Sequence, residues 1–342
     1  MSKNDTLLAS YIVAHFVVDF ACALLMYRMV LTAPYWYISL LLYNFCAFAL
    51  QMPVGLLADR INRNSLCAAL GCGLIALAYG FGNYAVLAAV IAGVGNGLFH
   101  VGGGIDVLNA SKRKPVLLGL FVSPGAFGIY LGTLLGKKGE VPLLLIAGAL
   151  IIAMVWILAA QYIKTRGFRS ANAPVSFQGI ASPGVLAAIG SLLLVVILRS
   201  YIGMNSNYGW KSSSWWAAAY IGAVVFGKIG GGVLALLLGA RRASILSLGL
   251  AAVCFLAADL PAAGVAAVFF FNMTMPLTLW AIGRILTRAK GFSFGLLTFG
   301  LFLGFIPSYL ELPMLLSNTA GFSAVSVLSM ALLSYGLRRA VE

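Results

Sequence analysis

Two pairs of polar side chains interrupt long apolar stretches of the sequence at the same spacing. His15 and Asp19 are four residues apart in the first stretch, and Asn96 and His100 repeat this spacing in the fourth. Four residues make about one turn of an α-helix, so the members of each pair lie on one face. A carboxylate beside an imidazole can bind and release a proton at physiological pH. His15, Asp19 and His100 are therefore candidate proton-binding residues.

The elements that carry these residues must be membrane-spanning helices. Of the 342 residues, 62% are hydrophobic and 9% are charged, and the mean hydropathy is +1.02. These values lie far outside the range of soluble domains. A spanning helix needs about 20 apolar residues, so the chain has room for roughly a dozen helices joined by short loops.

Two other interpretations are open for the polar pairs. His15 and Asp19 could satisfy each other's hydrogen bonds and serve only to fix helix packing. Two histidines and an aspartate could also hold a metal ion as a facial triad, but no HxxxH or carboxylate-rich spacing supports this, and we expect no metal. The position of His15 and Asp19 deep in the membrane favours a functional role over a packing role. An ionisable side chain in hydrocarbon is energetically costly and normally faces a cavity or a partner.

Twelve apolar stretches predict twelve spanning helices, six on each side of a polar linker. The linker covers residues 164–182, so we expect a six-helix bundle at 1–163 and a second at 183–342. The predicted spans are 7–30, 37–58, 65–81, 84–109, 115–136, 142–163, 183–204, 215–238, 243–260, 262–283, 292–312 and 316–337.

Basic residues support this number of spans, because loops must alternate between the two sides of the membrane. Most bases lie in loops on the side of the N-terminus, and the opposite loops carry only Arg28, Lys137, Lys138 and Lys211. The positive-inside rule then places both termini in the cytoplasm. Topology and anionic lipid explain the formal net charge of +14, and we expect no nucleic acid as a partner.

The deep charges of the second half are basic. Arg199 lies in the seventh predicted span and Lys228 in the eighth. A guanidinium holds a carboxylate or phosphonate through paired hydrogen bonds, and an ammonium supplies a point charge. Alternatively, both side chains could extend to the membrane interfaces. We take Arg199 and Lys228, together with Asn96 and with Asn272 in the tenth span, as candidate substrate-binding residues.

Residues 55–64 cover the end of the second predicted span and the turn after it, and they read Gly-Leu-Leu-Ala-Asp-Arg-Ile-Asn-Arg-Asn. This loop resembles the signature loop of the major facilitator superfamily, in which a glycine, a small residue, Asp-Arg, a turn residue and a second base recur in that order. Asn62 stands where the family usually has glycine, and Asn tolerates a left-handed turn. The twelve spans and the central linker extend the resemblance over essentially the whole chain.

The resemblance implies that residues 55–64, which we name the gate loop, act as a conformational latch. Gly55 lets two helices approach closely, and Asp59 can accept hydrogen bonds from the N-terminus of a neighbouring helix. Arg60 and Arg63 stay at the cytoplasmic surface. Asp106, near the end of the fourth span, is expected to belong to the same gate, with Arg60 or Arg63 as its partner.

A narrower resemblance concerns one group of the superfamily. Residues 95–100 (Gly-Asn-Gly-Leu-Phe-His) and 198–200 (Leu-Arg-Ser) are similar to stretches of the fosmidomycin-resistance group of proton-driven exporters. Residues 101–104 depart from it, because they are Val-Gly-Gly-Gly rather than that group's proline and acidic residue. The architecture of the superfamily implies that the first, fourth, seventh and tenth helices surround a central cavity, which would bring the two polar pairs together.

These features predict an all-α membrane protein that works as a proton-coupled secondary transporter by alternating access. We expect a small, anionic organic solute as substrate and the proton gradient as driving force, with a sodium gradient as an alternative and no cofactor. An exporter of hydrophobic drugs or lipids and a non-transporting receptor or scaffold are the competing functions.

An enzyme is not expected, because the sequence has no nucleophile with its base, no metal cluster and no nucleotide-binding loop. Glycines 102–104 lie within an apolar stretch, and no lysine follows them at P-loop spacing. The five cysteines lie in apolar stretches without metal-ligand spacing. We expect a monomer in the bilayer of a bacterial inner membrane.

Overall fold

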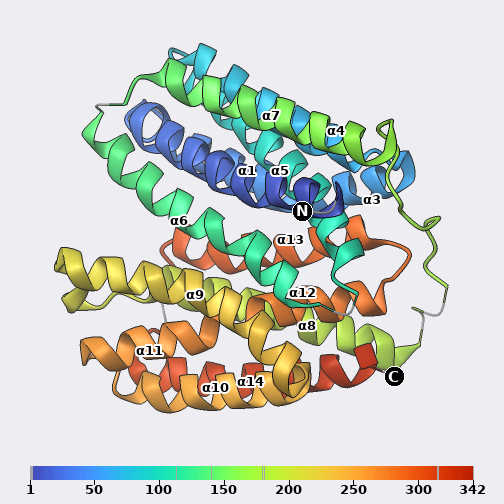
Figure 1. Ribbon diagram of the computed structural model, residues 1–342. Coiled ribbons are helices and arrows are strands. Elements are labelled where there is room, and N and C mark those ends of the chain that lie inside the picture. Colours follow the sequence, from blue (N-terminus) through green and yellow to red (C-terminus); the bar gives the residue numbers. More distant parts are fainter. Residues whose placement is uncertain are drawn as a thin grey trace. The chain divides into compact units, whose positions relative to one another are not determined.

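Apolar stretches form helices throughout the computed structural model, which describes residues 3–112, 114–139, 141–178, 180, 182–313 and 316–341 (Figure 1). The helices before the linker are α1 (Lys3–Leu25), α2 (Trp36–Asn44), α3 (Gln51–Ile61), α4 (Asn64–Ala78), α5 (Ala85–Ala110), α6 (Val116–Lys138) and α7 (Leu143–Thr165). Those after it are α8 (Pro183–Asn205), α9 (Ser214–Leu238), α10 (Ala240–Leu256), α11 (Pro261–Asn272), α12 (Thr274–Ile285), α13 (Lys290–Tyr309) and α14 (Thr319–Val341). Within the described residues there is no strand.

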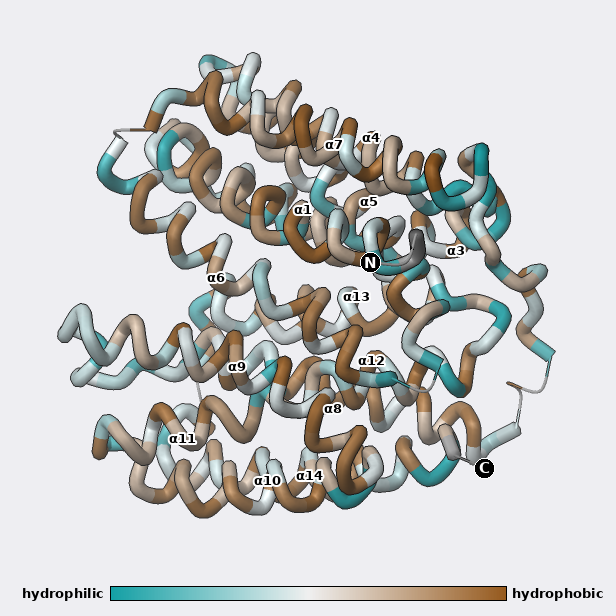
Figure 2. Tube along the Cα trace, viewed as in Figure 1, coloured by the Kyte–Doolittle hydropathy of each residue, from teal (hydrophilic) through white to brown (hydrophobic). Residues whose placement is uncertain are grey.

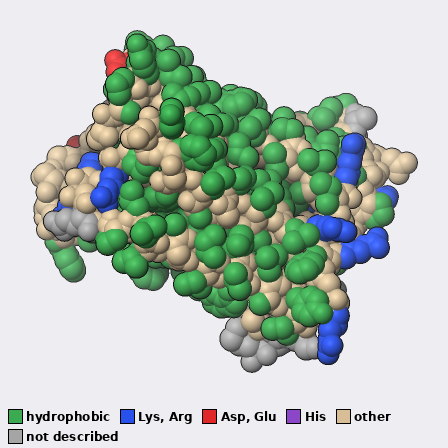
Figure 3. All heavy atoms as spheres, turned by 90° about the horizontal axis from the view of Figure 1, so that it is seen from above, with side chains coloured by type: hydrophobic (Ala, Val, Ile, Leu, Met, Phe, Trp, Pro, Cys, Tyr) green, Lys and Arg blue, Asp and Glu red, His purple; other side chains and the backbone are tan. Residues whose placement is uncertain are grey.

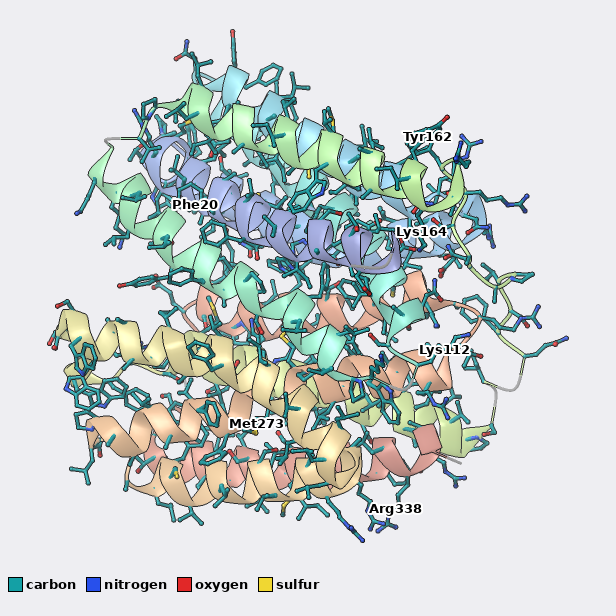
Figure 4. The ribbon with its side chains drawn as sticks, in the orientation of Figure 1. Phe20, Lys112, Tyr162, Lys164, Met273 and Arg338 are labelled. Carbon is teal, nitrogen blue, oxygen red and sulfur yellow. The ribbon has the colours of Figure 1, made fainter. Side chains whose placement is uncertain are left out.

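Several predicted spans consist of more than one helical piece. A π-helical turn, Met26–Val30, extends α1, and another, Phe45–Ala49, joins α2 to α3. Helices α11 and α12 form a single span that is interrupted at Met273, which Figure 4 labels. Pro276 explains this break, because its ring lacks an N–H and clashes with the carbonyl four residues earlier.

The twelve predicted spans all coincide with helical segments. In the described part of the chain, 11 segments are long and apolar enough to cross a membrane. The remaining predicted span, 243–260, corresponds to α10, which has 17 residues and is followed by a turn before Pro261 begins the next helix. The prediction of an all-α polytopic membrane protein is therefore confirmed, while the cytoplasmic location of the termini stays a prediction.

Large apolar side chains project outward from the spans. Leu144 is 86% exposed, Leu237 73% and Val253 67%. Figure 3 shows hydrophobic side chains spread over much of the face in view, and Figure 2 shows hydrophilic residues mainly at helix ends and in loops. Lipid tails are as apolar as these side chains, so a bilayer removes the free-energy cost of exposing the side chains to water.

The chain forms two compact units. The first contains Met1–Asn109, Pro124–Val175 and Arg288–Phe299, and the second contains Ala110–Ser123, Ser176–Thr287 and Gly300–Glu342. Helices α6 and α13 thus contribute residues to both units. In the first unit α7 packs against α1 and α4, and in the second α14 packs against α8 and α10. The division into bundles at 1–163 and 183–342 stays a prediction.

An aromatic cluster holds the loop between α8 and α9 within the second unit. Tyr208 stacks on Trp210 with their ring centroids 5.0 Å apart, and the Trp210 indole N–H donates to the Ala258 carbonyl over 3.0 Å. The Lys211 ammonium lies 3.7 Å from the centroid of the Tyr220 ring. Burial lowers the pKa of Lys211, and the ring face partly replaces the water that this ammonium has lost.

Candidate functional site

The structure brings the two polar pairs together inside the first unit. His15 and Asp19 lie on α1, and Asn96 and His100 lie on α5. The Nε2 atoms of His15 and His100 are 2.9 Å apart, and they lie 3.2 and 3.7 Å, respectively, from oxygens of the Asp19 carboxylate. The Asn96 amide donates to Asp19 Oδ1 over 3.1 Å. We name these four residues the polar cluster.

Very little of the polar cluster is accessible. His15 is 4% exposed, Asp19 8% and Asn96 3%, and the His100 side chain is 13% exposed. An ionised carboxylate in such surroundings must be neutralised by a partner or by a proton. The chain contains two histidines in all, and both lie beside the one carboxylate that is buried at the middle of α1.

A backbone contact fixes where His100 carries its hydrogen. Its Nδ1 atom lies 2.9 Å from the carbonyl oxygen of Asn96, and a carbonyl can only accept. We therefore assign the hydrogen of neutral His100 to Nδ1, which leaves a lone pair on the Nε2 atom that faces His15. With both imidazoles neutral and Asp19 ionised, the cluster carries one negative charge, so an added proton is attracted to it.

Gly125 of α6 packs directly against the polar cluster. A side-chain carbon at Gly125 would overlap Asp19 Oδ2 and His15 Nε2, so a larger residue cannot fit unless the cluster moves. The sequence does not predict this contact, because periodicity shows which residues share a helix face but not which helix meets that face.

Among the residues that the structure describes, the three ionisable side chains of the cluster are also the group that could hold a metal ion. Possible ligand atoms of His15, Asp19 and His100 all lie within 4.8 Å of one another. Two imidazoles and a carboxylate suit a divalent transition ion, although the sequence favours no metal. A chelator therefore belongs among the controls of every transport experiment on this protein.

The structure places the candidate substrate-binding residues in different surroundings. Asn96 belongs to the polar cluster of the first unit, whereas Arg199, Lys228 and Asn272 lie in the second unit. The Lys228 ammonium donates to the Val122 carbonyl over 3.1 Å, and the Asn272 amide donates within its own helix. These two side chains thus have protein partners.

Arg199 differs from the other candidate residues. It is 8% exposed, and its Nη1 atom is buried with no hydrogen-bond partner among the described residues. A buried guanidinium nitrogen left unpaired is costly. An anionic ligand is one way to satisfy it.

The gate loop contacts the first turn of α13. Asn62 ends α3 in the left-handed conformation that its residue type predicts, with φ of 56°. The Asp59 carboxylate accepts from the backbone N–H of Gly291 over 2.9 Å and from that of Phe292 over 3.1 Å. These amides are at a helix N-terminus, where a negative charge is stabilising. Side-chain carbons at Gly55 or Gly291 would overlap the facing backbone, so both glycines are needed for this contact.

Asp106 has other partners than predicted. Its carboxylate accepts from the Tyr11 hydroxyl over 2.8 Å and from the Asn64 amide over 2.6 Å. The prediction of Arg60 or Arg63 as its partner is therefore wrong. Both arginines are exposed, and in the described part of the chain Asp106 is satisfied by neutral donors that come from α1 and from the start of α4.

The linker is also bound to the gate loop. The Ser170 and Asn172 backbone N–H groups donate to the carbonyl and side-chain oxygens of Asn62 over 2.8 and 3.0 Å. The side-chain amides of Asn172 and Asn64 donate to each other over 2.9 and 2.8 Å, and the Asn109 amide donates to Asn172 over 3.1 Å. We name this arrangement the linker clasp. The sequence shows only a polar linker, and amide residues at helix ends are the weak signal that could have suggested it.

Replacement of Asn172 should open the linker clasp. Asn172→Ala removes the side-chain bonds to Asn64 and Asn109, and losing such bonds costs about 1–3 kcal/mol. We expect trypsin to cut after Arg169 about tenfold faster than in the wild type, because local opening sets the cleavage rate. Gln178→Ala, at an exposed linker position, serves as the control. Equal cleavage of all three proteins would show that Asn172 does not hold the linker.

Solved structures share this fold. No protein-family model matches the chain, and no curated protein matches it. FucP, a major facilitator superfamily transporter crystallised in the outward conformation, is 15% identical with a TM-score of 0.63, over 97% of this chain and 100% of that chain. A variant of the E. coli fucose:proton symporter FucP is 13% identical with a TM-score of 0.65, over 98% of each chain. This chain therefore has the fold of major facilitator superfamily transporters.

Proposed function

We propose that this protein is a proton-coupled secondary transporter that moves a small, anionic organic solute by alternating access. The observation that carries the proposal is the polar cluster, in which the only two histidines of the chain meet a buried carboxylate. A fold shared with a fucose:proton symporter supports it. Fold alone does not imply function, so the proposal depends on the chemistry of these side chains.

In this proposal the polar cluster holds the coupling proton. When protonated, the cluster has no net charge, and its burial between α1, α5 and Gly125 is favourable. After proton release the negative charge favours a state in which water reaches Asp19. The two states of the cluster thus favour different conformations, which is what coupling a gradient to transport requires.

The proposed substrate contact is Arg199. Its buried and unpaired Nη1 atom supports an anion, because a carboxylate or phosphonate can accept two parallel hydrogen bonds from a guanidinium. Lys228 would add positive charge, and Asn272 a polar contact. The gate loop and the linker clasp would control access. We further propose a monomer in a bacterial inner membrane and kinship with the fosmidomycin-resistance group.

A ligand screen by thermal stabilisation tests the proposal without knowledge of the substrate. Purified protein is mixed with carboxylates, phosphonates, neutral sugars and hydrophobic drugs, and Tm is followed against ligand concentration. We expect stabilisation by a member of the anionic set that saturates with concentration. Stabilisation by hydrophobic drugs alone would favour a drug or lipid exporter, and a ligand that binds but is never transported would favour a receptor.

Arg199→Lys should then weaken binding of the anionic ligand by about tenfold or more. Lysine keeps the charge but loses the planar pair of donors, and a hydrogen bond between charged groups contributes about 1.5–3 kcal/mol. The affinity is measured from the same Tm curves, with Arg338→Lys as the control at an exposed position. Unchanged affinity in Arg199→Lys would assign Arg199 to structure rather than to the substrate.

A further inference from the structure

An apolar groove lies on the outside of the first unit, and residues of the gate loop form part of its lining. Its volume is about 290 Å³, and it is lined by side chains of α3, α4 and α5, which are Val54, Leu57, Ala58, Ile61, Leu66, Cys67, Leu70 and Leu98, together with Arg63. Leu57, Ile61 and Leu70 are each more than half exposed. The groove therefore opens outward, and its inner wall includes Ala58, which packs against Val101 and Ile105.

Arg63 is the one charged residue in the lining of this groove. It lies at the junction of α3 and α4, and its side chain is exposed. The acidic residues nearby are engaged elsewhere, since Asp59 binds backbone amides of α13 and Asp106 binds Tyr11 and Asn64. The guanidinium of Arg63 is thus available to a ligand, and Arg60 adds a second positive charge at the end of α3.

We propose that this groove binds one anionic phospholipid, with an acyl chain against the leucines and the phosphate on Arg63. The helices that form the groove are spans, so lipid is the occupant that their surroundings supply. The apolar lining suits an acyl chain, and a guanidinium suits a phosphate through paired hydrogen bonds. The apolar lining and Arg63 therefore suit the acyl chain and the headgroup of one phospholipid molecule.

The position of the groove connects the lipid to the gate. Ala58 lines the groove and directly precedes Asp59, whose carboxylate holds the first turn of α13. A lipid seated in the groove contacts the last turns of α3 and so stabilises the arrangement in which that contact forms. The proposal depends on the chain being in a membrane and does not depend on proton coupling or on the nature of the solute.

Native mass spectrometry of delipidated protein tests the proposal, with phosphatidylglycerol and phosphatidylcholine as matched probes. We expect the wild type to retain one phosphatidylglycerol more tightly than phosphatidylcholine. Arg63→Gln should weaken phosphatidylglycerol binding about fivefold and remove the preference for phosphatidylglycerol over phosphatidylcholine. The attraction between one basic residue and an anionic headgroup changes the affinity by about this factor. Arg338→Gln removes the same charge away from the groove and should bind as the wild type does.

A second variant examines the acyl-chain part of the site. Leu66→Phe narrows the groove without changing charge, and it should weaken binding of both lipids severalfold. Equal binding of phosphatidylglycerol by the wild type, Arg63→Gln and Leu66→Phe would overturn the proposal. Equal losses in Arg63→Gln and Arg338→Gln would also overturn it, as would displacement of the lipid by glycerol phosphate at similar concentration, because that result would show a phosphate site alone.

Discussion

Asp19→Asn should abolish transport driven by a pH gradient and leave exchange of the bound solute across the membrane measurable. Asparagine is nearly the same size and can still accept a hydrogen bond from Asn96 or His15, but it cannot hold the negative charge that attracts the proton. Gradient-driven accumulation should fall by at least about 100-fold, as expected when a positioned proton carrier is lost. Both activities are measured in vesicles with a ligand found by the thermal screen.

Asp259→Asn is the matched control for this experiment, because it makes the same chemical change at an exposed turn. A chelator is added in parallel, and unchanged transport would separate proton coupling from metal binding at the three possible ligands. If Asp19 only fixes packing with His15, Asp19→Asn should lower Tm while residual transport still depends on the gradient. That outcome would refute the coupling role of Asp19.

Asp59→Asn should slow transport by about tenfold or more and leave the affinity for solute nearly unchanged. The carboxylate accepts from two backbone amides at the start of α13, whereas an asparagine amide group would face one of these N–H groups with a donor. Hydrogen bonds to a charged group contribute about 1.5–3 kcal/mol. The transport rate is measured as the rate of solute exchange in vesicles, and the affinity for solute is measured from Tm curves.

Folded yield is the control for Asp59→Asn and is read from gel filtration. A normal transport rate at normal yield would remove the gate role of Asp59. A loss of affinity as large as the loss of rate would instead place Asp59 with the substrate site.

Much of the fold could be predicted because membrane helices follow directly from local sequence. The length of each apolar stretch defines a span, and even local details such as the left-handed turn at Asn62 follow from residue type. The pairing of His15 and Asp19 with Asn96 and His100 also follows from spacing, once the resemblance to a known fold indicates that α1 and α5 face each other.

The contacts that the sequence does not predict join segments that are far apart in the chain. Asp106 accepts hydrogen bonds from Tyr11 and Asn64 rather than from an arginine, because these neutral donors lie beside it whereas Arg60 and Arg63 are exposed. Asn172 in the linker meets Asn64, and Gly125 meets the polar cluster. None of these contacts has a periodic signal, because each depends on which helices and loops become neighbours.

The most direct test of proton coupling is the movement of protons when solute is added. Vesicles that contain the purified protein and a trapped pH-sensitive dye receive the ligand found by the screen, with no gradient imposed. We predict a change in internal pH whose rate rises and saturates with ligand concentration, and no such change with Asp19→Asn. Solute movement across wild-type vesicles at an unchanged internal pH would contradict proton coupling.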